Sequence, residues 1–317
     1  MSADGRQRPG PLAERVRSGD PAALARALSR AENGDETLMQ ALRPAAGSAT
    51  VVGFTGPPGA GKSTLINALI RDWRDAGRRI AVLAVDPVSP LSGGAVLGDR
   101  TRMGEHSMDR DVFIRSVSAR GHLGGLSSAT HDMIDVMDAA GWGLILLETV
   151  GSGQSETEVS ELADIRVVVA APGLGDEVQA IKAGILEIAD ILVVNKADHA
   201  DAARTARDLA AMVELRSAMA PDVPVLQTCA TTSKGIDSLR RKIEKAAAAP
   251  GTDRHARRLA ALKLRLADIL ARRLRSAIED DPALDPLIAE VAAGRRGMDD
   301  ALGAVMEKVR FLPDGQD

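Results

Sequence analysis

Aromatic residues are scarce in this chain of 317 residues, which has two Trp, three Phe and no Tyr. The core must therefore be built from Leu, Ile, Val and Ala, and the aromatic platforms on which nucleic-acid bases stack are missing. The chain also lacks an excess of basic residues, because its formal net charge is −4. A general nucleic-acid binder carries a strongly positive surface, so we expect no nucleic-acid partner.

Cysteine and long apolar runs are also lacking. Cys229 is the only cysteine, which excludes a disulfide within the chain and a cysteine-based zinc cluster. No apolar run approaches the ~20 residues that a membrane-spanning helix needs. The polar start over 1–11 has no apolar signal core. These absences predict a cytoplasmic protein with no membrane partner.

Apolar runs of strand length recur along the middle of the chain, separated by helical stretches or longer loops. Near-continuous apolar strands that alternate with helices predict an α/β fold, with a mostly parallel sheet covered on both faces. Ligands bind such sheets at the carboxyl ends of the strands. The expected strands are 50–55, 80–85, 112–115, 144–147, 165–170, 191–194 and 223–226.

The composition suggests three regions. Residues 1–46 form a loose tail and a helical extension, in which Asp20 is a good N-cap before Pro21. Residues 47–250 hold the alternating strands and helices. Residues 251–317 are Arg- and Leu-rich and helical, with one amphipathic stripe outside the sheet. This stripe predicts either packing on its own domain or a dimerisation arm, and its apolar residues are Leu259, Leu262, Leu266, Ile269 and Leu270.

Eight consecutive residues fit GxxxxGK[ST], the phosphate-binding P-loop, between the strand 50–55 and a helix over 63–76. Glycines let backbone N–H groups point at phosphate oxygens. Lys62 is placed to reach the β- and γ-phosphates as a point charge. Ser63 opens the helix, where its hydroxyl can join Mg²⁺, and Thr64 follows it. The eight residues are Gly56, Pro57, Pro58, Gly59, Ala60, Gly61, Lys62 and Ser63.

Asn195-Lys196-Ala197-Asp198 follows the strand 191–194 and has the NKxD arrangement that reads guanine. The carboxylate of Asp198 can accept hydrogen bonds from guanine N1–H and N2–H₂. Adenine would leave that carboxylate unpaired, at a cost of about 1–3 kcal/mol. Asn195 would tie the loops together and Lys196 would lie along the base. We therefore expect GTP and GDP as ligands.

Cys229-Ala230-Thr231 follows the last expected strand, where guanine-binding proteins place an SAK-like contact to the base. Cys229 holds the Ser position, so we expect the contact to come mainly from backbone amides. The alternative is a simple buried cysteine.

Three acids are candidate Mg²⁺ ligands, because hard oxygen donors suit that ion. Glu148 opens Glu148-Thr149-Val150-Gly151 at the end of a strand, where most GTPases have DxxG, and Gly151 would sense the γ-phosphate. An acid that closes an apolar strand is costly unless a metal or donors satisfy it. Asp86 closes the strand 80–85, and Asp99 follows a loop rich in Ser, Pro and Gly. The alternative for both aspartates is capping.

These motifs resemble those of the MeaB/ArgK-type GTPases, the G-protein chaperones of adenosylcobalamin-dependent acyl-CoA mutases such as methylmalonyl-CoA mutase. The similarity runs from about Asp20 to the C-terminal helices. It is carried most specifically by the blocks 86–103, 113–125, 148–156 and 172–185.

The resemblance implies GTP hydrolysis that is slow alone and faster on the mutase, and a homodimer formed through the C-terminal arm. It places an extra switch segment at 172–182. It also implies that Lys182 reaches the nucleotide only when the mutase docks, and that it then stabilises phosphoryl transfer. The residues that would sense the phosphate or the partner are Gly151, Gln154, Asp176, Gln179 and Lys182.

The chain departs from the family pattern in loops that resemble switches, at Val88, Ala95 and Ser116-Val117. These departures bear on which mutase is served. Two other functions stay open. A metal-insertion GTPase of the nickel type would need a Cys/His cluster, and the five histidines show no metal spacing. An ArgK-like kinase would use ATP, whereas NKxD favours GTP.

Overall fold

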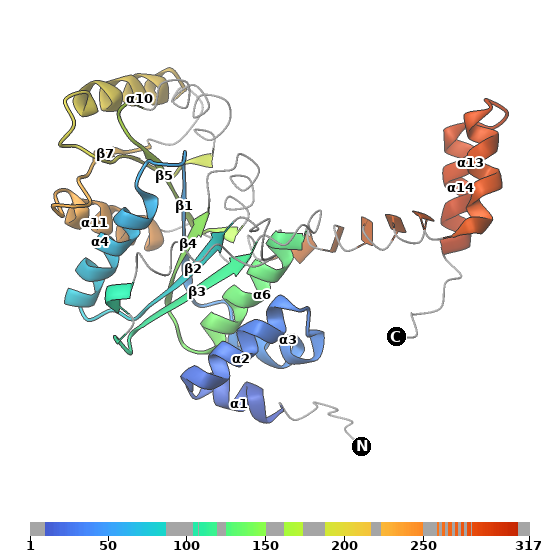
Figure 1. The fold of residues 1–317 in the computed structure, drawn as a ribbon, viewed down its shortest axis with the longest axis horizontal. Helices are drawn as coiled ribbons and strands as arrows, with labels where there is room; N and C mark the ends of the chain where they lie inside the picture. Colours follow the sequence, from blue (N-terminus) through green and yellow to red (C-terminus); the bar gives the residue numbers. More distant parts are fainter. Residues whose placement is uncertain are drawn as a thin grey trace. The chain divides into compact units, whose positions relative to one another are not determined.

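A computed structural model gives the fold of the chain (Figure 1). It describes residues 10–86, 104–106, 108–118, 125–149, 162–173, 188–216, 223–249 and 281–309, together with pairs and single residues between 259 and 279. The chain divides into two compact units, Met1–His255 and Ala256–Asp317.

The first unit is built on a seven-stranded sheet whose order is β3-β2-β4-β1-β5-β6-β7. Every neighbouring pair of strands is parallel, so the predicted α/β fold with a parallel sheet is confirmed. The apolar runs form these strands because both faces of the sheet are covered. The strands are β1 Thr50–Thr55, β2 Ile80–Asp86, β3 Val112–Ser118, β4 Leu144–Thr149, β5 Ile165–Ala170, β6 Ile191–Val194 and β7 Val225–Gln227.

Helices cover the two faces of the sheet, and alternate strand residues point to opposite sides. Val52 and Phe54 of β1 join a buried cluster with α4 (Lys62–Asp75) and α11 (Ile236–Ala247). Val51 faces the other side, in a cluster with α6 (Gly125–Ala139). Figure 1 shows α4 and α11 on one side of the strands and α6 on the other. A third cluster joins β5 and β6 to α10 (Ala202–Arg216).

The N-terminal helices share a core with α6. They are α1 Pro11–Arg17, α2 Pro21–Glu32 and α3 Glu36–Leu42. As the sequence predicts, the Asp20 carboxylate caps α2, accepting from the backbone N–H groups of Ala22 and Ala23 at 2.9 and 3.2 Å. Leu24 and Leu28, one turn apart on α2, are buried in the cluster that contains α6. The helical extension therefore belongs to the packed core of the first unit.

The second unit contains a helical pair, α13 (Asp285–Ala292) and α14 (Met298–Val309), which follow a short 3₁₀ turn at Pro282–Leu284. Leu284 and Ala301 are buried in this unit. The described residues between 259 and 279 are helical, in line with the predicted amphipathic run. Three of its apolar side chains, Leu259, Leu266 and Leu270, are exposed in this structure.

Candidate nucleotide-binding site

The loop between β1 and α4 is built on glycines that the surrounding protein requires. Gly56 has a φ of 139°, and a Cβ there would lie 2.1 Å from the backbone oxygen of Val169 on β5. Gly61 has a φ of 86°, and a Cβ there would lie 2.5 Å from the Nδ2 atom of Asn195. Side chains at these positions would push the loop away from β5 and from the loop that carries Asn195.

Lys62 begins α4 and is buried inside the loop. Its Nζ atom donates to the backbone oxygens of Gly56 at 2.7 Å and Pro57 at 3.1 Å. The ammonium group is therefore held where the positive end of the α4 dipole also points. Thr64, one residue after Ser63, is exposed. A helix start with a nearby ammonium favours the phosphates of a nucleotide.

The Ser63 hydroxyl donates to the Oε1 atom of Glu148 at 2.6 Å. Glu148 is 3% exposed and lies near the carboxyl end of β4, where it pairs with Phe54 of β1. A hydroxyl and a carboxylate at this distance are hard oxygen donors of the kind that Mg²⁺ prefers. Asp86 is the last residue of β2 and lies at the same edge of the sheet, but its side chain is outside the described part of the chain.

Asn195 joins three loops at the carboxyl edge of the sheet. It is 2% exposed and directly follows β6. Its Nδ2 atom donates to the backbone oxygen of Ala60 in the P-loop at 3.0 Å. Its Oδ1 atom accepts from the backbone N–H of Ala230 at 3.2 Å and from the Thr228 hydroxyl at 3.3 Å. One buried amide thus connects the phosphate loop, its own loop and the loop after β7.

The base-reading loop is held by the segment that follows β7. Lys196 is exposed and has a left-handed φ of 55°, and the backbone N–H of Ala197 donates to Thr228 O at 2.9 Å. Asp198 is exposed, and its Oδ1 atom accepts from the Cys229 thiol at 3.3 Å. That hydrogen bond is the main cause that lowers the pKa of the Asp198 carboxyl below its ordinary value, so the carboxylate stays ionised.

A family model described as "Methylmalonyl Co-A mutase-associated GTPase MeaB" matches residues 24–283 of the chain. The chain belongs to the MeaB family. This assignment confirms the family resemblance that the sequence motifs indicate.

Known proteins similar to this MeaB-family chain agree with the assignment. A protein from Pyrococcus abyssi assigned as a GTPase is 49% identical over 240 residues, 74% of each chain. GTPase ArgK of Escherichia coli is 42% identical over 195 residues, 58% of each chain. A mouse protein named methylmalonic aciduria type A homolog, mitochondrial, is 48% identical over 147 residues, 46% of this chain and 35% of that protein.

The crystal structure of a protein named LAO/AO transport system kinase has the same fold. The two structures agree with a TM-score of 0.71 at 25% sequence identity, over 95% of this chain and 97% of the other. The likeness supports the assignment of the MeaB-family chain to the P-loop fold.

The structure brings together most of the site residues that the sequence predicts for this MeaB-family member. The P-loop, Glu148 and the loops of Asn195 and Cys229 meet at one edge of the sheet. Thr228, which the sequence did not single out, also contributes a hydrogen bond to Asn195. Its place just before Cys229 is the only feature of the sequence that could have indicated this role. The predicted residues that lie outside the described part of the chain are Asp99, Gly151, Gln154, Asp176, Gln179 and Lys182.

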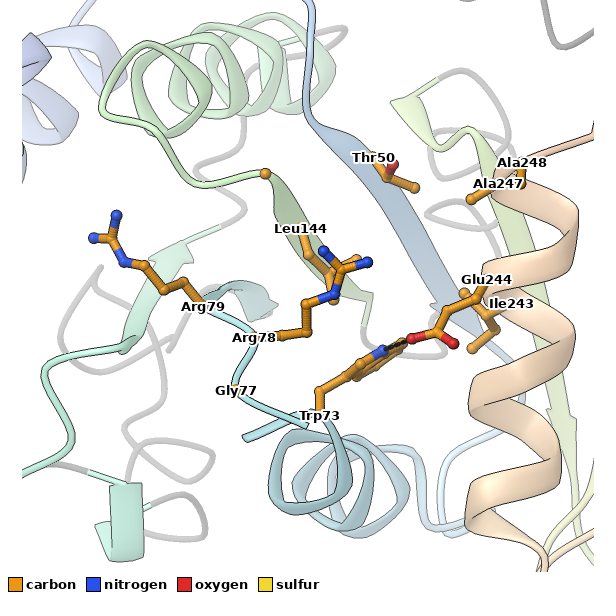
Figure 2. A pocket seen from close by; sticks show the side chains of 11 residues that line it. Thr50, Trp73, Gly77, Arg78, Arg79, Leu144, Ile243, Glu244, Ala247 and Ala248 are labelled. Atoms are coloured by element: carbon orange, nitrogen blue, oxygen red, sulfur yellow. Dashed lines mark hydrogen bonds between the residues drawn. The ribbon is translucent and has the colours of Figure 1, made fainter. Parts of the chain in front are cut away.

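A pocket of about 480 Å³ opens at the opposite, amino edge of the sheet (Figure 2). It lies beside Thr50 and Leu144, the first residues of β1 and β4. The Trp73 Nε1 atom donates to Glu244 across it at 3.1 Å. Figure 2 shows Arg79 pointing away from the pocket. None of the predicted nucleotide-binding residues lines this pocket, so it is separate from the candidate site.

No group of three or more His, Cys, Asp or Glu side chains in the described part of the chain is placed to hold a metal ion. No helix there is long and apolar enough to cross a membrane.

Proposed function

We propose that this chain is a GTP-hydrolysing chaperone that gates cofactor loading of an adenosylcobalamin-dependent acyl-CoA mutase and protects or reactivates it. The guanine-nucleotide part rests on one observation, the Asn195 amide that joins the P-loop to the base-reading loop. The mutase part is supported by the description of the matching family and by the name of the mouse relative.

In this proposal the backbone N–H groups of the P-loop and the Lys62 ammonium bind the phosphates. Asp198 accepts from guanine N1–H and N2–H₂, and an adenine would leave the carboxylate without these donors. Because Asn195 connects the two loops, a correctly bound base also supports the position of the P-loop. Binding of the base and binding of the phosphates are therefore expected to be coupled.

The donor set at the P-loop suits magnesium. Ser63 and Glu148 would hold the ion, and Asp86 and Asp99 are proposed as further ligands, directly or through water. When bound, Mg²⁺ supplies positive charge that neutralises the phosphates during hydrolysis. The short contact between Ser63 and Glu148 keeps both oxygens at the same edge of the sheet before any ligand arrives.

The proposed switch residues sense the γ-phosphate and the partner. Gly151 and Gln154 follow β4, and Asp176, Gln179 and Lys182 follow β5. In a parallel sheet both segments leave the strands at the edge where the nucleotide is bound. Lys182 would add its positive charge only when the mutase docks, which would accelerate phosphoryl transfer. Support for these roles is the family resemblance.

Nucleotide turnover with and without purified methylmalonyl-CoA mutase tests the proposal. We expect the mutase to raise GTP hydrolysis and to leave ATP hydrolysis unchanged. Lys182→Ala should abolish the stimulated rate and spare the basal rate. Lys242→Ala, which removes an exposed lysine from α11, is the matched control and should keep both rates. Equal loss of both rates in Lys182→Ala would contradict the proposed role of Lys182.

Homodimerisation through the C-terminal unit is the second part of the proposal. Leu266 and Leu270 are 67% and 65% exposed in this structure, and a second copy would cover such a stripe. Light scattering of the full chain should show a dimer, and Leu266→Glu should convert it to a monomer. Lys263→Glu adds the same acid at an exposed position of the same helical run and should stay dimeric. A monomeric wild type would contradict this part.

The name of the similar solved structure, LAO/AO transport system kinase, favours one alternative, an ArgK-like kinase. ATP-dependent phosphate transfer to a protein or small-molecule acceptor, with no response of GTP hydrolysis to the mutase, would support the kinase. The nickel-type alternative has no comparable support, since the sequence has a single cysteine. The cytoplasmic location stays a prediction.

A further inference from the structure

The pocket at the amino edge of the sheet has an apolar floor. Trp73 of α4 and Ile243 of α11 line it, and each is 1% exposed. Leu144 and Ala247, which also line the pocket, are partly buried against the same cluster. The volume of about 480 Å³ lies in the range of small-molecule pockets, which combine apolar walls with a few polar groups.

The acid that lines the pocket, Glu244, already has donors for both of its carboxylate oxygens. Its Oε1 atom accepts from Trp73 Nε1 at 3.1 Å, and its Oε2 atom accepts from Arg240 Nη1 at 2.9 Å. These hydrogen bonds connect α4 to α11 and form one wall of the pocket. Because the Arg240 guanidinium compensates the charge of Glu244, this acid is not available to bind a cationic ligand.

Arg78 brings a positive charge to the pocket on a fixed backbone. Its N–H donates to Trp73 O at 2.9 Å, and its carbonyl oxygen accepts from Arg74 Nη1 at 2.7 Å. Arg74 and Arg79 each form an ion pair with Asp111. The Arg78 guanidinium, by contrast, has no acid partner within the described part of the chain. Figure 2 shows its side chain directed in among the lining residues.

We propose that this pocket binds a small aliphatic carboxylate, whose charged end pairs with Arg78 and whose tail lies against Trp73 and Ile243. The planar guanidinium matches a carboxylate with two parallel hydrogen bonds. One guanidinium balances the single charge of a carboxylate, whereas a phosphate monoester carries nearly two charges. Burial of the tail against the apolar floor removes it from water. This second site does not depend on the proposed binding of guanine nucleotides.

Titration with hexanoate, followed by calorimetry and by the fluorescence of Trp73, tests the inference. The chain has two Trp, so a Trp142→Phe background leaves the Trp73 indole as the only one. 1-Hexanol has the same tail without the charge, and acetate has the charge without the tail. We expect both to bind at least about tenfold more weakly than hexanoate. Equal affinity for hexanoate and 1-hexanol, or no saturable binding of hexanoate by either method, would overturn the inference.

Two arginine variants test the charged end of the site. Arg78→Gln should weaken hexanoate binding by about tenfold, the effect of losing a hydrogen-bonded charge, and leave 1-hexanol binding unchanged. Arg79→Gln is the matched control, because it removes the same charge one residue away from a side chain that points away from the pocket (Figure 2). Hexanoate affinity should stay within about twofold in this control. Equal losses in the two variants would contradict the role of Arg78.

A third variant tests where the tail lies. Ala247→Leu places a larger side chain at the wall of the pocket, so hexanoate and 1-hexanol should both bind at least about tenfold more weakly. Unchanged binding of both would contradict the placement of the tail. Saturation with GDP should leave hexanoate affinity unchanged, since no predicted nucleotide-binding residue lines the pocket. A protein that binds GDP but not hexanoate would overturn this inference and leave the proposed function standing.

Discussion

The two edges of the parallel sheet carry polar side chains in different ways. At the carboxyl edge, Lys62, Ser63 and Asn195 are buried. Lys62 contacts its own P-loop, whereas Ser63 and Asn195 contact segments that are distant in the sequence. At the amino edge, polar side chains connect helices. Arg240 of α11 donates to Asp72 of α4 at 2.6 Å and to Glu244 at 2.9 Å.

The difference separates a ligand site from a structural contact. Burying polar and charged groups costs free energy unless partners compensate. The carboxyl edge concentrates an ammonium, a carboxylate and an amide around a loop with left-handed glycines, an arrangement that suits a phosphate ligand. The amino edge pairs acids with guanidinium groups between two helices, which stabilises their packing. Substitutions at matched positions on the two edges should therefore have different effects.

The largest difference is expected between Lys62→Ala and Arg78→Ala. Lys62 supplies the ammonium inside the P-loop, and its loss should weaken GTP binding by about 1,000-fold, as for removal of a key charged donor. Arg78 lies at the amino-edge pocket, and its loss should leave GTP affinity unchanged. Calorimetric titration measures the GTP affinity of both variants. Similar GTP affinities of Lys62→Ala and Arg78→Ala would contradict the functional difference between the two edges.

A second comparison uses two glycines with positive φ. In Gly56→Ala the new Cβ would meet Val169 O at 2.1 Å, and we expect a loss of unfolding free energy of about 3 kcal/mol. Gly77, at the amino edge, has a φ of 73°, and an added Cβ there would meet nothing within 4 Å. Gly77→Ala should cost only the strain of a left-handed alanine, about 1 kcal/mol. Urea unfolding measures both values, and equal losses would contradict the close approach of β5.

A third comparison concerns two hydrogen-bonded side chains. Asn195→Ala leaves the Ala230 N–H without its acceptor and should cost about 2 kcal/mol of unfolding free energy. GDP affinity should fall with it. Glu244→Ala removes the acceptor of Trp73 and should cost about 1 kcal/mol while GDP affinity stays the same. A loss of GDP affinity in Glu244→Ala would show that the edges are coupled.

The smallest effect concerns pH. The Arg74 guanidinium, which contacts Asp109 at 2.7 Å, is the main cause that lowers the pKa of Asp109 below its ordinary value of 3.8. The ionised carboxylate therefore stabilises the fold above pH 3.8, and this contribution is lost as the pH falls through the lowered pKa. Unfolding of Arg74→Ala and wild type should differ at neutral pH, and the difference should shrink below pH 3.8.

The pKa of Asp198 is also lowered, and the hydrogen bond from the Cys229 thiol is the main cause. Cys229→Ala should raise the pKa of Asp198 toward the ordinary value, which NMR titration measures. Because Asp198 is exposed, unfolding in acid should change little. These results would assign Asp198 to binding and Asp109 to structure. A strong change in acid stability in Cys229→Ala, or no change in acid stability in Arg74→Ala, would contradict that assignment.

Much of the fold could be predicted because parallel strands covered on both faces are near-continuous apolar runs. All seven predicted strands are present. The prediction ended β3 too early, at Arg115, whereas the strand continues to Ser118. Polar residues are tolerated there because β3 is an edge strand, and Arg115 forms an ion pair with Glu32 of α2 at 3.0 Å. An apolar pattern cannot indicate a partner that is 83 residues away.

The site could be predicted where chemistry follows from local spacing, as in the P-loop and NKxD. It could not be predicted where a contact joins distant segments. The thiol of Cys229 reaches Asp198 across 31 positions of sequence. From the sequence, the glycines of the P-loop are expected because phosphate oxygens approach the backbone closely. The structure shows a further reason at Gly56, since a Cβ there would collide with the backbone of Val169.

Calorimetric titration of the wild-type chain with GDP and ADP, in the presence of Mg²⁺, measures whether the site at the carboxyl edge selects guanine. We expect GDP to bind at least about 100-fold more tightly than ADP, because Asp198 rejects a base that lacks the matching donors. Equal affinity for the two nucleotides, or no heat of binding with GDP, would contradict it.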